Sequence, residues 1–304
     1  MTSTTRTAPS GQTAPGGSGL ERPLREGAKR TLRAWGELTA SLRCLPSFMI
    51  IGAKRGGTTS LYKYLLQHPK IEPLFPARQN IKGTHFFDSE FHRGVRWYRS
   101  HFPTGAYSAL RSRGDVPALA GEGSPYYLFH PLAAERAAEV APDAKLIALL
   151  RDPVERAYSH YKERLRHSSE ELSFEQALDA EPARLAGEEE RLRREPGYYS
   201  YEHEHRSYVA QGRYLDMLPR WLDRYPSERV LILPSEDLYA DPQATVDRIF
   251  AFLGLPPFAL RDVTRHNYVP TGSMRQQTRH HLQRLFAEHN RELARYLGMP
   301  LPWA

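Results

Sequence analysis

An apolar run that leads into a glycine-containing turn and then into a helical pattern constrains the fold more than any other feature of the sequence. Residues 48–52 are largely apolar, residues 53–60 contain two adjacent glycines followed by three hydroxyl side chains, and residues 61–66 continue with helical character. This order predicts a strand, a loop and a helix. Because such a loop directs backbone N–H groups and the positive end of the helix dipole at an anion, the stretch predicts a phosphate-binding loop.

The loop differs at one position from the nucleotide P-loop, G-x-x-x-x-G-K-[ST]. Its two glycines, Gly52 and Gly57, have the correct spacing, but Thr58 occupies the position of the lysine. Positive charge lies inside the loop instead, at Lys54 and Arg55. The pattern therefore favours a nucleotide with a 5'-phosphate over a triphosphate that is held with magnesium.

A second boundary between a strand and a helix carries an arginine. Residues 145–150 form a short apolar run of strand type, Arg151 follows directly, and Ser159 lies eight positions later on the predicted helix. A guanidinium and a hydroxyl at such a place can converge on one phosphate. The alternative is a salt bridge at the helix start between Arg151 and Asp152 or Glu155.

Together these two stretches resemble the sulfotransferases that use 3'-phosphoadenosine 5'-phosphosulfate (PAPS), and the resemblance covers roughly residues 48–255. Residues 82–88 are similar to the Lys-x-x-His-Phe-Phe-Asp run of the heparan sulfate and bacterial carbohydrate branch. The resemblance implies a single α/β domain built like a P-loop kinase, with a central parallel β-sheet flanked by helices. It also implies transfer of a sulfonate from PAPS to a hydroxyl of a carbohydrate, a glycosylated metabolite or another small molecule, with release of adenosine 3',5'-bisphosphate.

The resemblance also implies which residues bind the co-substrate PAPS. In the family, the first loop holds the 5'-phosphosulfate, and an arginine with a serine eight positions later holds the 3'-phosphate. The matching positions of this sequence are Lys54, Arg55, Gly56, Gly57, Thr58, Thr59, Ser60, Arg151 and Ser159. Arg55 departs from the family, which usually has a lysine there to stabilise charge on the bridging oxygen as the sulfonate leaves. An arginine keeps the charge but does not easily donate a proton, and Lys54 compensates only if its side chain reaches the same pocket.

Sulfonate transfer needs a group that accepts the proton of the acceptor hydroxyl while that oxygen attacks sulfur. The carbohydrate branch often has a glutamate after the lysine that matches Lys82, but Gly83 occupies that position here. Two candidate bases remain, because His85 matches the family's histidine and Glu122 ends a predicted strand. Their structural alternatives are a core imidazole for His85 and an ion-pair partner of Lys82 or an arginine for Glu122. Lys82 is expected to orient the sulfonate, and Asp88 to orient neighbouring groups.

Charge and composition indicate how the rest of the chain is organised. The chain has 304 residues and a net charge of +7, and residues 1–47 hold seven Lys/Arg against three Asp/Glu, so +4 of the charge belongs to this arm. We expect residues 1–44 to form a basic arm that is disordered or helical, and residues 45–304 to form the sulfotransferase domain. With a single cysteine, no run of about 18 apolar residues and no apolar signal core near the start, the sequence favours a cytoplasmic protein.

Further elements follow from apolar spacing and from Pro and Gly positions. The remaining helices are predicted over residues 20–42, 59–67, 153–167, 174–178, 208–224, 242–253 and 276–297, and the remaining strands over residues 118–122 and 230–233. The helix over residues 20–42 has an apolar stripe that predicts packing on the core or a linker, with a membrane surface as the alternative. Residues 181–205 are dense in charge, which indicates either a solvated insertion or a wall of the acceptor cleft.

Two other functions compete with sulfonate transfer. A P-loop kinase would depend on magnesium, and the missing loop lysine argues against it. A nucleic-acid-binding protein that uses the basic arm would bind oligonucleotides with a steep salt dependence, which would disappear without residues 1–47. The sequence predicts no metal cofactor, because no cysteine or carboxylate pattern completes a zinc site among the 13 histidines.

Overall fold

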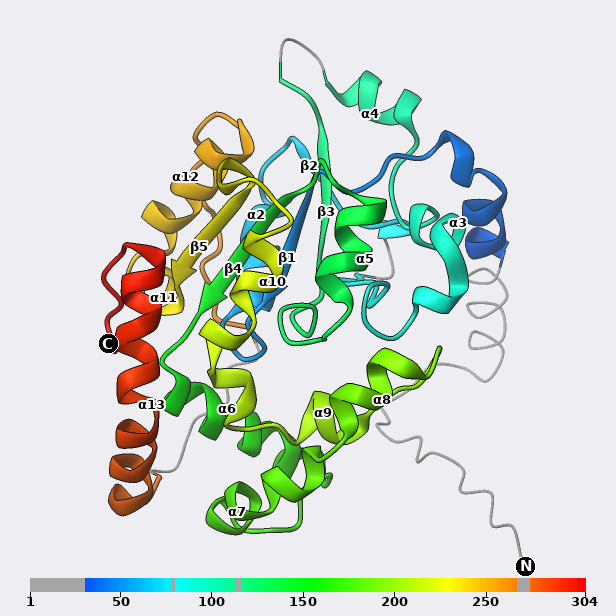
Figure 1. Ribbon diagram of the computed structural model, residues 1–304. Helices are drawn as coiled ribbons and strands as arrows, with labels where there is room; N and C mark the ends of the chain where they lie inside the picture. Colours follow the sequence, from blue (N-terminus) through cyan, green and yellow to red (C-terminus); the bar gives the residue numbers. More distant parts are fainter. Residues whose placement is uncertain (1–30, 78–79, 113–115, 267–273) are drawn as a thin grey trace, which may run out of the picture.

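A parallel sheet lies at the centre of the structure, a computed structural model that describes residues 31–77, 80–112, 116–266 and 274–304. In this part of the chain the sheet has five strands in the order β2-β3-β1-β4-β5, and all neighbours are parallel (Figure 1). The strands are β1 (Phe48–Gly52), β2 (Ile71–Glu72), β3 (Leu119–Gly123), β4 (Lys145–Leu150) and β5 (Val230–Pro234). The predicted fold class, one α/β domain with a parallel sheet flanked by helices, is confirmed.

Helices cover both faces of the sheet, which explains why β1, and β4 after Lys145, are apolar. Alternate residues of β1 point to opposite faces, so Phe48 and Ile50 enter one core cluster and Met49 and Ile51 the other. The first cluster includes side chains of α2 (Thr58–Leu65) and α12 (Pro242–Leu253). The second includes side chains of α3 (Gly94–Arg99), α5 (Ala133–Val140), α10 (Leu218–Leu222) and α13 (Gln276–Leu297).

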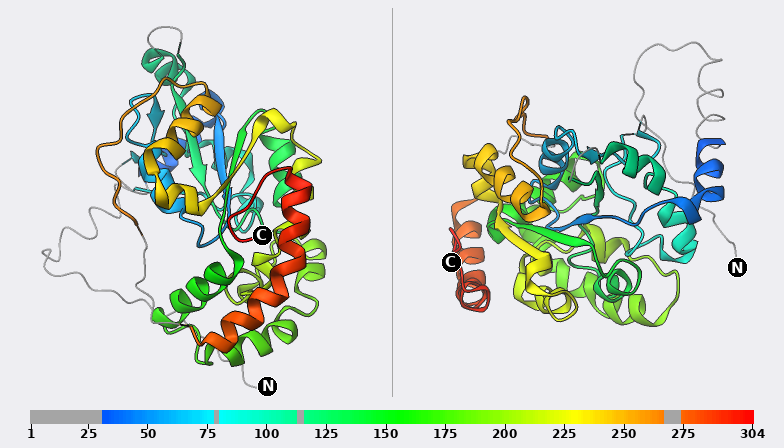
Figure 2. Two further views of the ribbon diagram at one scale, coloured as in Figure 1. Left: turned by 90° about the vertical axis from the view of Figure 1, so that its left-hand side faces the viewer. Right: turned by 90° about the horizontal axis from the view of Figure 1, so that it is seen from above.

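A group of helices lies beyond the carboxyl ends of the strands. Figure 1 shows α6 (Pro153–Arg166), α7 (Phe174–Leu185), α8 (Glu188–Arg194) and α9 (Tyr201–His205) below the sheet. In Figure 2, α13 passes from the sheet toward this group, and it contacts α6. The remaining elements are η1 (Ala40–Leu42), η3 (Phe91–Arg93), α4 (Gly105–Arg111), η4 (Ala210–Gly212), η5 (Tyr214–Asp216), η6 (Ser227–Arg229) and α11 (Ser235–Ala240).

Several predicted boundaries agree with the structure, and others are wrong. The predictions for α12 and α13 are confirmed, and Gly254 ends α12 with a φ of 81°. The helix predicted over residues 208–224 is instead two short turns and α10, and Gly212 in the first turn packs against other elements. The turn predicted over residues 174–178 is the start of the longer α7, which begins with a capping box.

The apolar stripe near the start of the described chain lies on the surface. Residues 31–38 are helical, but Leu38 and Leu42 are 75% and 67% exposed, so the predicted packing of the stripe on the core is wrong. Trp35 is half-exposed against Phe75. The predicted disorder or helix over residues 1–30 lies outside the described residues. Among the residues that the structure describes, no helix has both the length and the hydrophobicity of a membrane span.

Candidate active site

The predicted phosphate-binding loop joins β1 to α2 at the carboxyl edge of the sheet. Gly57 is the N-cap of α2 and has a φ of 89°, a conformation that favours glycine. A Cβ atom on Gly56 would lie 2.7 Å from the backbone oxygen of Leu149. Both glycines are therefore needed for the loop to approach its neighbours, and the first turn of α2 presents its free N–H groups at this edge.

A pocket of about 550 Å³ opens over the loop. It brings together most of the predicted site residues, namely Lys54, Arg55, Gly57, Thr58, Thr59, Ser60, Lys82, His85, Arg151 and Ser159. Gly83, the position next to Lys82, also lines it. Of the predicted set, Gly56 and Glu122 are not among its lining residues. Its other lining residues, which sequence reasoning did not identify, are Gly123, Pro125, Tyr126, Glu163, Arg164, Glu204, His205, Tyr239, Arg265 and His266.

Arg55 links the loop to the pair formed by Arg151 and Ser159. Its Nε donates to Ser159 Oγ at 3.1 Å, its guanidinium pairs with Glu163 at 2.8 Å, and its backbone oxygen accepts from Arg151 at 3.1 Å. Burial lowers the pKa of Arg55, and the charge of Glu163 opposes this shift. The two phosphate-binding stretches therefore touch one another through this side chain.

The carboxylates considered as alternative partners of Arg151 have other contacts. Asp152 caps α6 by accepting from the N–H of Val154 at 2.8 Å, which explains why the helix begins at this point. Glu155 pairs with Arg279 of α13. The Arg151 guanidinium instead faces the pocket, 6.0 Å from the ring of Tyr239.

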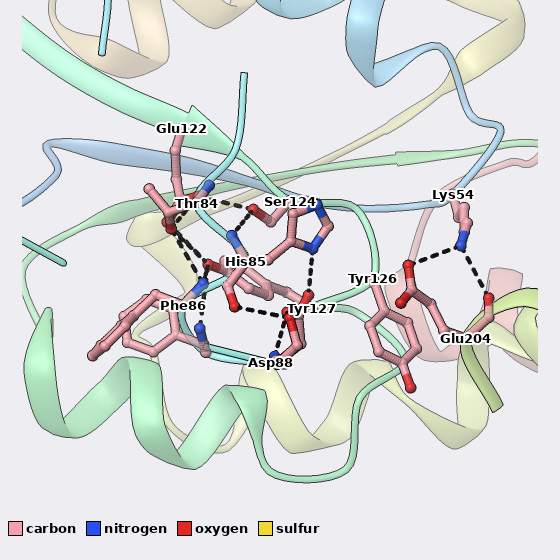
Figure 3. A network of polar contacts seen from close by, with 12 residues as sticks. Lys54, Thr84, His85, Phe86, Asp88, Glu122, Ser124, Tyr126, Tyr127 and Glu204 are labelled. Atoms are coloured by element: carbon pink, nitrogen blue, oxygen red, sulfur yellow. Dashed lines mark hydrogen bonds and ion pairs between the residues drawn. The ribbon is translucent and has the colours of Figure 1, made fainter. Parts of the chain in front are cut away.

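Lys54 points away from Arg55, toward α9. Its ammonium donates to the Glu204 backbone oxygen at 3.0 Å and pairs with Glu204 Oε1 at 3.1 Å (Figure 3). Burial lowers the pKa of Lys54, and Glu204 opposes this shift. Burial also raises the pKa of Glu204, but Lys54, His205 and Tyr199 outweigh burial and bring it to about 2. The Glu204 carboxylate is therefore ionised around neutral pH.

Lys82 lines the same pocket and contacts the start of α2. Its ammonium donates to Thr58 Oγ1 at 3.1 Å, so it sits at the start of α2. Burial lowers the pKa of Lys82 to about 8, and the charge of Glu122 opposes this shift. The side chain thus keeps most of its positive charge at neutral pH and can face an anion in the pocket.

His85 stands at the edge of the pocket with 44% of its side chain exposed, so it is not a core imidazole. Its Nδ1 lies 3.0 Å from Oδ2 of Asp88, which confirms that Asp88 orients a neighbour. Burial lowers the pKa of His85, but the hydrogen bond and charge of Asp88 outweigh it and raise the pKa to about 9. The imidazole is therefore protonated at neutral pH and acts there as a hydrogen-bond donor.

Glu122 is fully buried beneath the pocket and accepts hydrogen bonds from every side (Figure 3). The donors are the N–H and hydroxyl of Thr84 at 2.7 and 2.9 Å, the hydroxyl of Ser124 at 2.9 Å, and those of Tyr98 and Tyr127 at 2.8 and 3.1 Å. These contacts tie the segment after Lys82 to β3 and α3. The surroundings of Glu122 favour a structural role.

Gly83 occupies a position with no space for a side chain. A Cβ atom there would lie 2.4 Å from Ser124 Oγ and 2.5 Å from the backbone oxygen of Gly123. The backbone of Lys82 also accepts from the N–H of Gly123 at 2.8 Å. The close approach of the two backbones explains why a glutamate cannot simply be placed at this position.

Tyr239 and Arg265 form a wall of the pocket that no sequence motif predicted. The Arg265 guanidinium lies 4.4 Å from the Tyr239 ring and donates to its backbone oxygen at 3.0 Å. These residues come from α11 and from the segment after α12, where the sequence shows only ordinary turn and loop composition. Across the described ranges, no group of three or more His, Cys, Asp and Glu side chains is placed to hold a metal ion.

A phosphate-binding loop and a second basic stretch that meet in one pocket on a parallel sheet are typical of group-transfer enzymes with anionic co-substrates. The chain belongs to the sulfotransferase family, because the model of the sulfotransferase domain matches residues 45–295. It is 30% identical to a solved sulfotransferase from Alicyclobacillus acidocaldarius, with a TM-score of 0.64 over 86% of this chain and 99% of that one.

Two relatives act on heparan sulfate according to their names. The chain is 32% identical over 221 residues to human bifunctional heparan sulfate N-deacetylase/N-sulfotransferase 2, and this covers 70% of the chain and 22% of the relative. It is 30% identical over 242 residues to mouse heparan sulfate glucosamine 3-O-sulfotransferase 3A1, which covers 80% of the chain and 53% of the relative. The chain therefore spans about a fifth and about half of these relatives.

Proposed function

We propose that the protein transfers a sulfonate from PAPS to a hydroxyl of a carbohydrate, a glycosylated metabolite or another small molecule. The by-product is adenosine 3',5'-bisphosphate. The observation that carries this proposal is the meeting of two separate phosphate-binding stretches, the loop after β1 and the Arg151–Ser159 pair, in one pocket. A nucleotide with phosphate groups at both its 5' and 3' positions matches this arrangement.

The donor set of the pocket suits an anionic co-substrate. We propose that the loop amides and residues 58–60 hold the 5'-phosphosulfate, and that Arg151 and Ser159 hold the 3'-phosphate. PAPS, when bound, supplies the sulfonate and a phosphate leaving group. Lys82, which contacts Thr58, and protonated His85 both line the pocket, and we propose that they donate hydrogen bonds to the sulfonate oxygens.

The position of Arg55 bears on the leaving group. Its guanidinium already contacts Ser159 and Glu163, so we propose that it joins the 3'-phosphate site to the loop. Lys54, whose side chain reaches the pocket, then takes the role of stabilising charge on the bridging oxygen. An ammonium suits this role because it presents a compact charge and can donate a proton.

The two candidate bases from the sequence analysis have surroundings that favour other roles. Protonated His85 has no free lone pair until its pKa of about 9 is passed. Glu122 is buried and receives five hydrogen bonds, which hold the backbone beneath the pocket. We therefore propose that another residue of the pocket takes the proton of the acceptor hydroxyl.

The names of the relatives indicate the class of acceptor. The heparan sulfate named for both relatives is a polysaccharide, which supports a carbohydrate acceptor.

The P-loop kinase alternative is not favoured. A kinase would turn over ATP with magnesium, whereas we expect turnover of PAPS without added metal. Binding of oligonucleotides that disappears without residues 1–47 would instead support the nucleic-acid alternative.

Calorimetry with two nucleotides tests the proposed function. We expect Arg151→Ala to weaken the binding of adenosine 3',5'-bisphosphate by roughly 10- to 100-fold, which is the contribution of a charge-assisted hydrogen bond. The affinity for adenosine 5'-phosphate should stay nearly unchanged. The control is Arg229→Ala, since Arg229 pairs with Asp143 away from the pocket. Equal losses for both nucleotides would remove Arg151 from the 3'-phosphate, and no binding of either nucleotide to the natural protein would overturn the proposal.

A further inference from the structure

We infer that Glu204 is the carboxylate that accepts the proton of the acceptor hydroxyl, in the role that position 83 cannot fill. This inference rests on the proposed sulfonate transfer. Position 83 lies beside Lys82 and His85 at the pocket, but its backbone is pressed against Gly123 and Ser124, so any side chain there requires the backbone to move. A base in this pocket must therefore come from another element.

Among the residues that the structure describes, two carboxylates line the pocket, Glu163 and Glu204. Glu163 lies on α6 and pairs with Arg55 at 2.8 Å and with Arg164 at 3.1 Å, next to Ser159. Its place is therefore the side of the pocket that we assign to the 3'-phosphate. This leaves Glu204 as the pocket carboxylate outside the 3'-phosphate side.

Glu204 is held by contacts that fix its orientation while leaving it at the pocket. Its Oε1 pairs with Lys54 at 3.1 Å, and its Oε2 accepts from the hydroxyl of Tyr199 at 2.8 Å. The side chain is 12% exposed, and His205 lies beside it, with Nε2 3.5 Å from Oε2. Figure 3 shows Tyr126 between this pair and His85, and Glu204 lines the same pocket as Lys82 and His85, the proposed donors to the sulfonate.

The sequence context explains how the carboxylate reaches this place. Ser200 caps α9 by accepting from the N–H of His203 at 3.0 Å, and this fixes the start of the short helix. His203 then stacks on Phe129 and its Nδ1 bonds the hydroxyl of Tyr126 at 2.7 Å, which anchors α9 against the loop after β3. The charged segment over residues 181–205 thus supplies a wall of the pocket.

The proton transfer follows from these contacts. The acceptor O–H bond breaks and its proton passes to the Glu204 carboxylate, while the acceptor oxygen forms a bond to sulfur. The bond between sulfur and the bridging oxygen breaks, and its electron pair stays on the phosphate of adenosine 3',5'-bisphosphate. Lys54 contacts Glu204 and lines the same pocket as the loop, so sharing its charge with a bound phosphosulfate would raise the proton affinity of the carboxylate.

Two acceptors separate a base from a merely structural group. An unsulfated heparan-type oligosaccharide offers hydroxyls that must lose a proton, whereas 4-nitrophenol is largely ionised in mildly alkaline buffer and needs no base. We expect Glu204→Gln to slow single-turnover transfer from PAPS to the oligosaccharide by about 10²- to 10⁴-fold, the usual contribution of a general base. Transfer to 4-nitrophenol should change little.

Two further variants serve as controls. Glu202→Gln changes a neighbouring carboxylate on α9 that pairs with Arg206 outside the pocket, and we expect no effect with either acceptor. Glu204→Asp keeps the charge but withdraws it from the pocket, so it should slow the oligosaccharide reaction by less than Glu204→Gln does. It also gives a folded variant if the loss of the Lys54 pair prevents folding.

The possible outcomes distinguish this inference from the proposed function. A natural protein that binds no adenosine 3',5'-bisphosphate and sulfates neither acceptor overturns the proposed function. A natural protein that is active, with Glu204→Gln equally slow on both acceptors or as fast as the natural protein on the oligosaccharide, overturns only the role of Glu204. Selective loss on the oligosaccharide supports both.

Discussion

The sheet edge and the helical segment over residues 188–205 build opposite walls of one pocket by different means. At the sheet edge, buried strands and helix starts fix the backbone, and the loop after β1 presents N–H groups and hydroxyls whose positions follow from the fold. In the helical segment, long side chains are placed by ion pairs, such as Lys54 with Glu204. The loop wall of the pocket is thus positioned by the backbone, whereas the wall from the helical segment depends on charge pairing.

Two glutamates illustrate the same contrast. Glu122 is fully buried, and its five hydrogen bonds come from backbone and hydroxyl donors. Glu204 reaches the pocket and is bound by a lysine and a tyrosine that can change partners when an anion enters. Glu122, whose hydrogen-bond partners are all neutral, therefore stabilises the structure. Glu204, whose partner is a cation that can move to another anion, is available for the reaction.

Apart from Glu204, the largest effect is expected at Lys82, whose ammonium contacts the Thr58 hydroxyl of the loop. We expect Lys82→Met to lower the rate of single-turnover transfer from PAPS by about 10²- to 10³-fold, because a donor to developing charge in a preorganised site is lost. Rapid-quench measurements with saturating PAPS give this rate. Lys70→Met provides the control, since Lys70 bonds the backbone of Arg111 away from the pocket. An unchanged rate would separate Lys82 from the sulfonate.

The second prediction concerns the structural glutamate. Glu122→Gln places an amide nitrogen where hydroxyl and N–H donors point, so we expect the free energy of unfolding to fall by about 2–3 kcal/mol. Urea denaturation measures this change. Affinity for adenosine 3',5'-bisphosphate should be retained at temperatures where the variant is folded. Normal stability together with a lost chemical step would instead show that Glu122 belongs to the reaction.

Most of the fold can be predicted from the sequence, because its signals are local. The apolar run over residues 145–150 is bounded by a helix start, and α12 lies between Asp241 with its following proline and Gly254. The helix predicted over residues 208–224 is wrong because a tertiary contact, and not the local sequence pattern, determines the backbone conformation there. Gly212 lies against Pro153 and Phe286, where an added Cβ would come within 3.0 Å of both side chains.

The two walls of the pocket also differ in how far they could be predicted from the sequence. The loop and the Arg151 helix carry motifs, since backbone spacing alone brings their groups to one edge. The directions of Lys54 and Arg55 could not be predicted, because each is set by a carboxylate distant in sequence, Glu204 for the first and Glu163 for the second. The charge density of residues 181–205 revealed a surface segment but not which of its carboxylates turns inward.

A third prediction tests whether backbone contact excludes a side chain next to Lys82. Gly83→Ala should lower the free energy of unfolding by roughly 1–2 kcal/mol, as overpacking does, because its Cβ would meet the backbone of Gly123. Gly83→Glu should be no more active than the natural protein. Gly105→Ala is the matched control, since a Cβ there lies 3.8 Å from its nearest neighbour. A stable and faster Gly83→Glu variant would contradict the crowding at this position.

The smallest effect is expected from the charge of His85, and it depends on pH. The folded pKa of His85 is raised to about 9 from 6.5, so its stabilising contribution is complete below pH 6.5 and is lost as the pH rises through about 9. The melting temperatures of the natural protein and His85→Gln should differ most below pH 6.5 and converge above pH 9. The imidazole is half-exposed, so the free-energy difference should stay below about 1 kcal/mol.

The source of this pH dependence can be assigned with one further variant. Asp88 contacts the imidazole directly, and Glu204 and Glu122 act on it from greater distance, so Asp88→Asn should return the His85 pKa most of the way toward its ordinary value. NMR titration of the imidazole measures this shift. If the pKa instead falls most in Glu204→Gln, the helical segment, and not the turn that carries His85, sets the charge at the pocket edge. The two walls would then be electrostatically coupled even before a nucleotide binds.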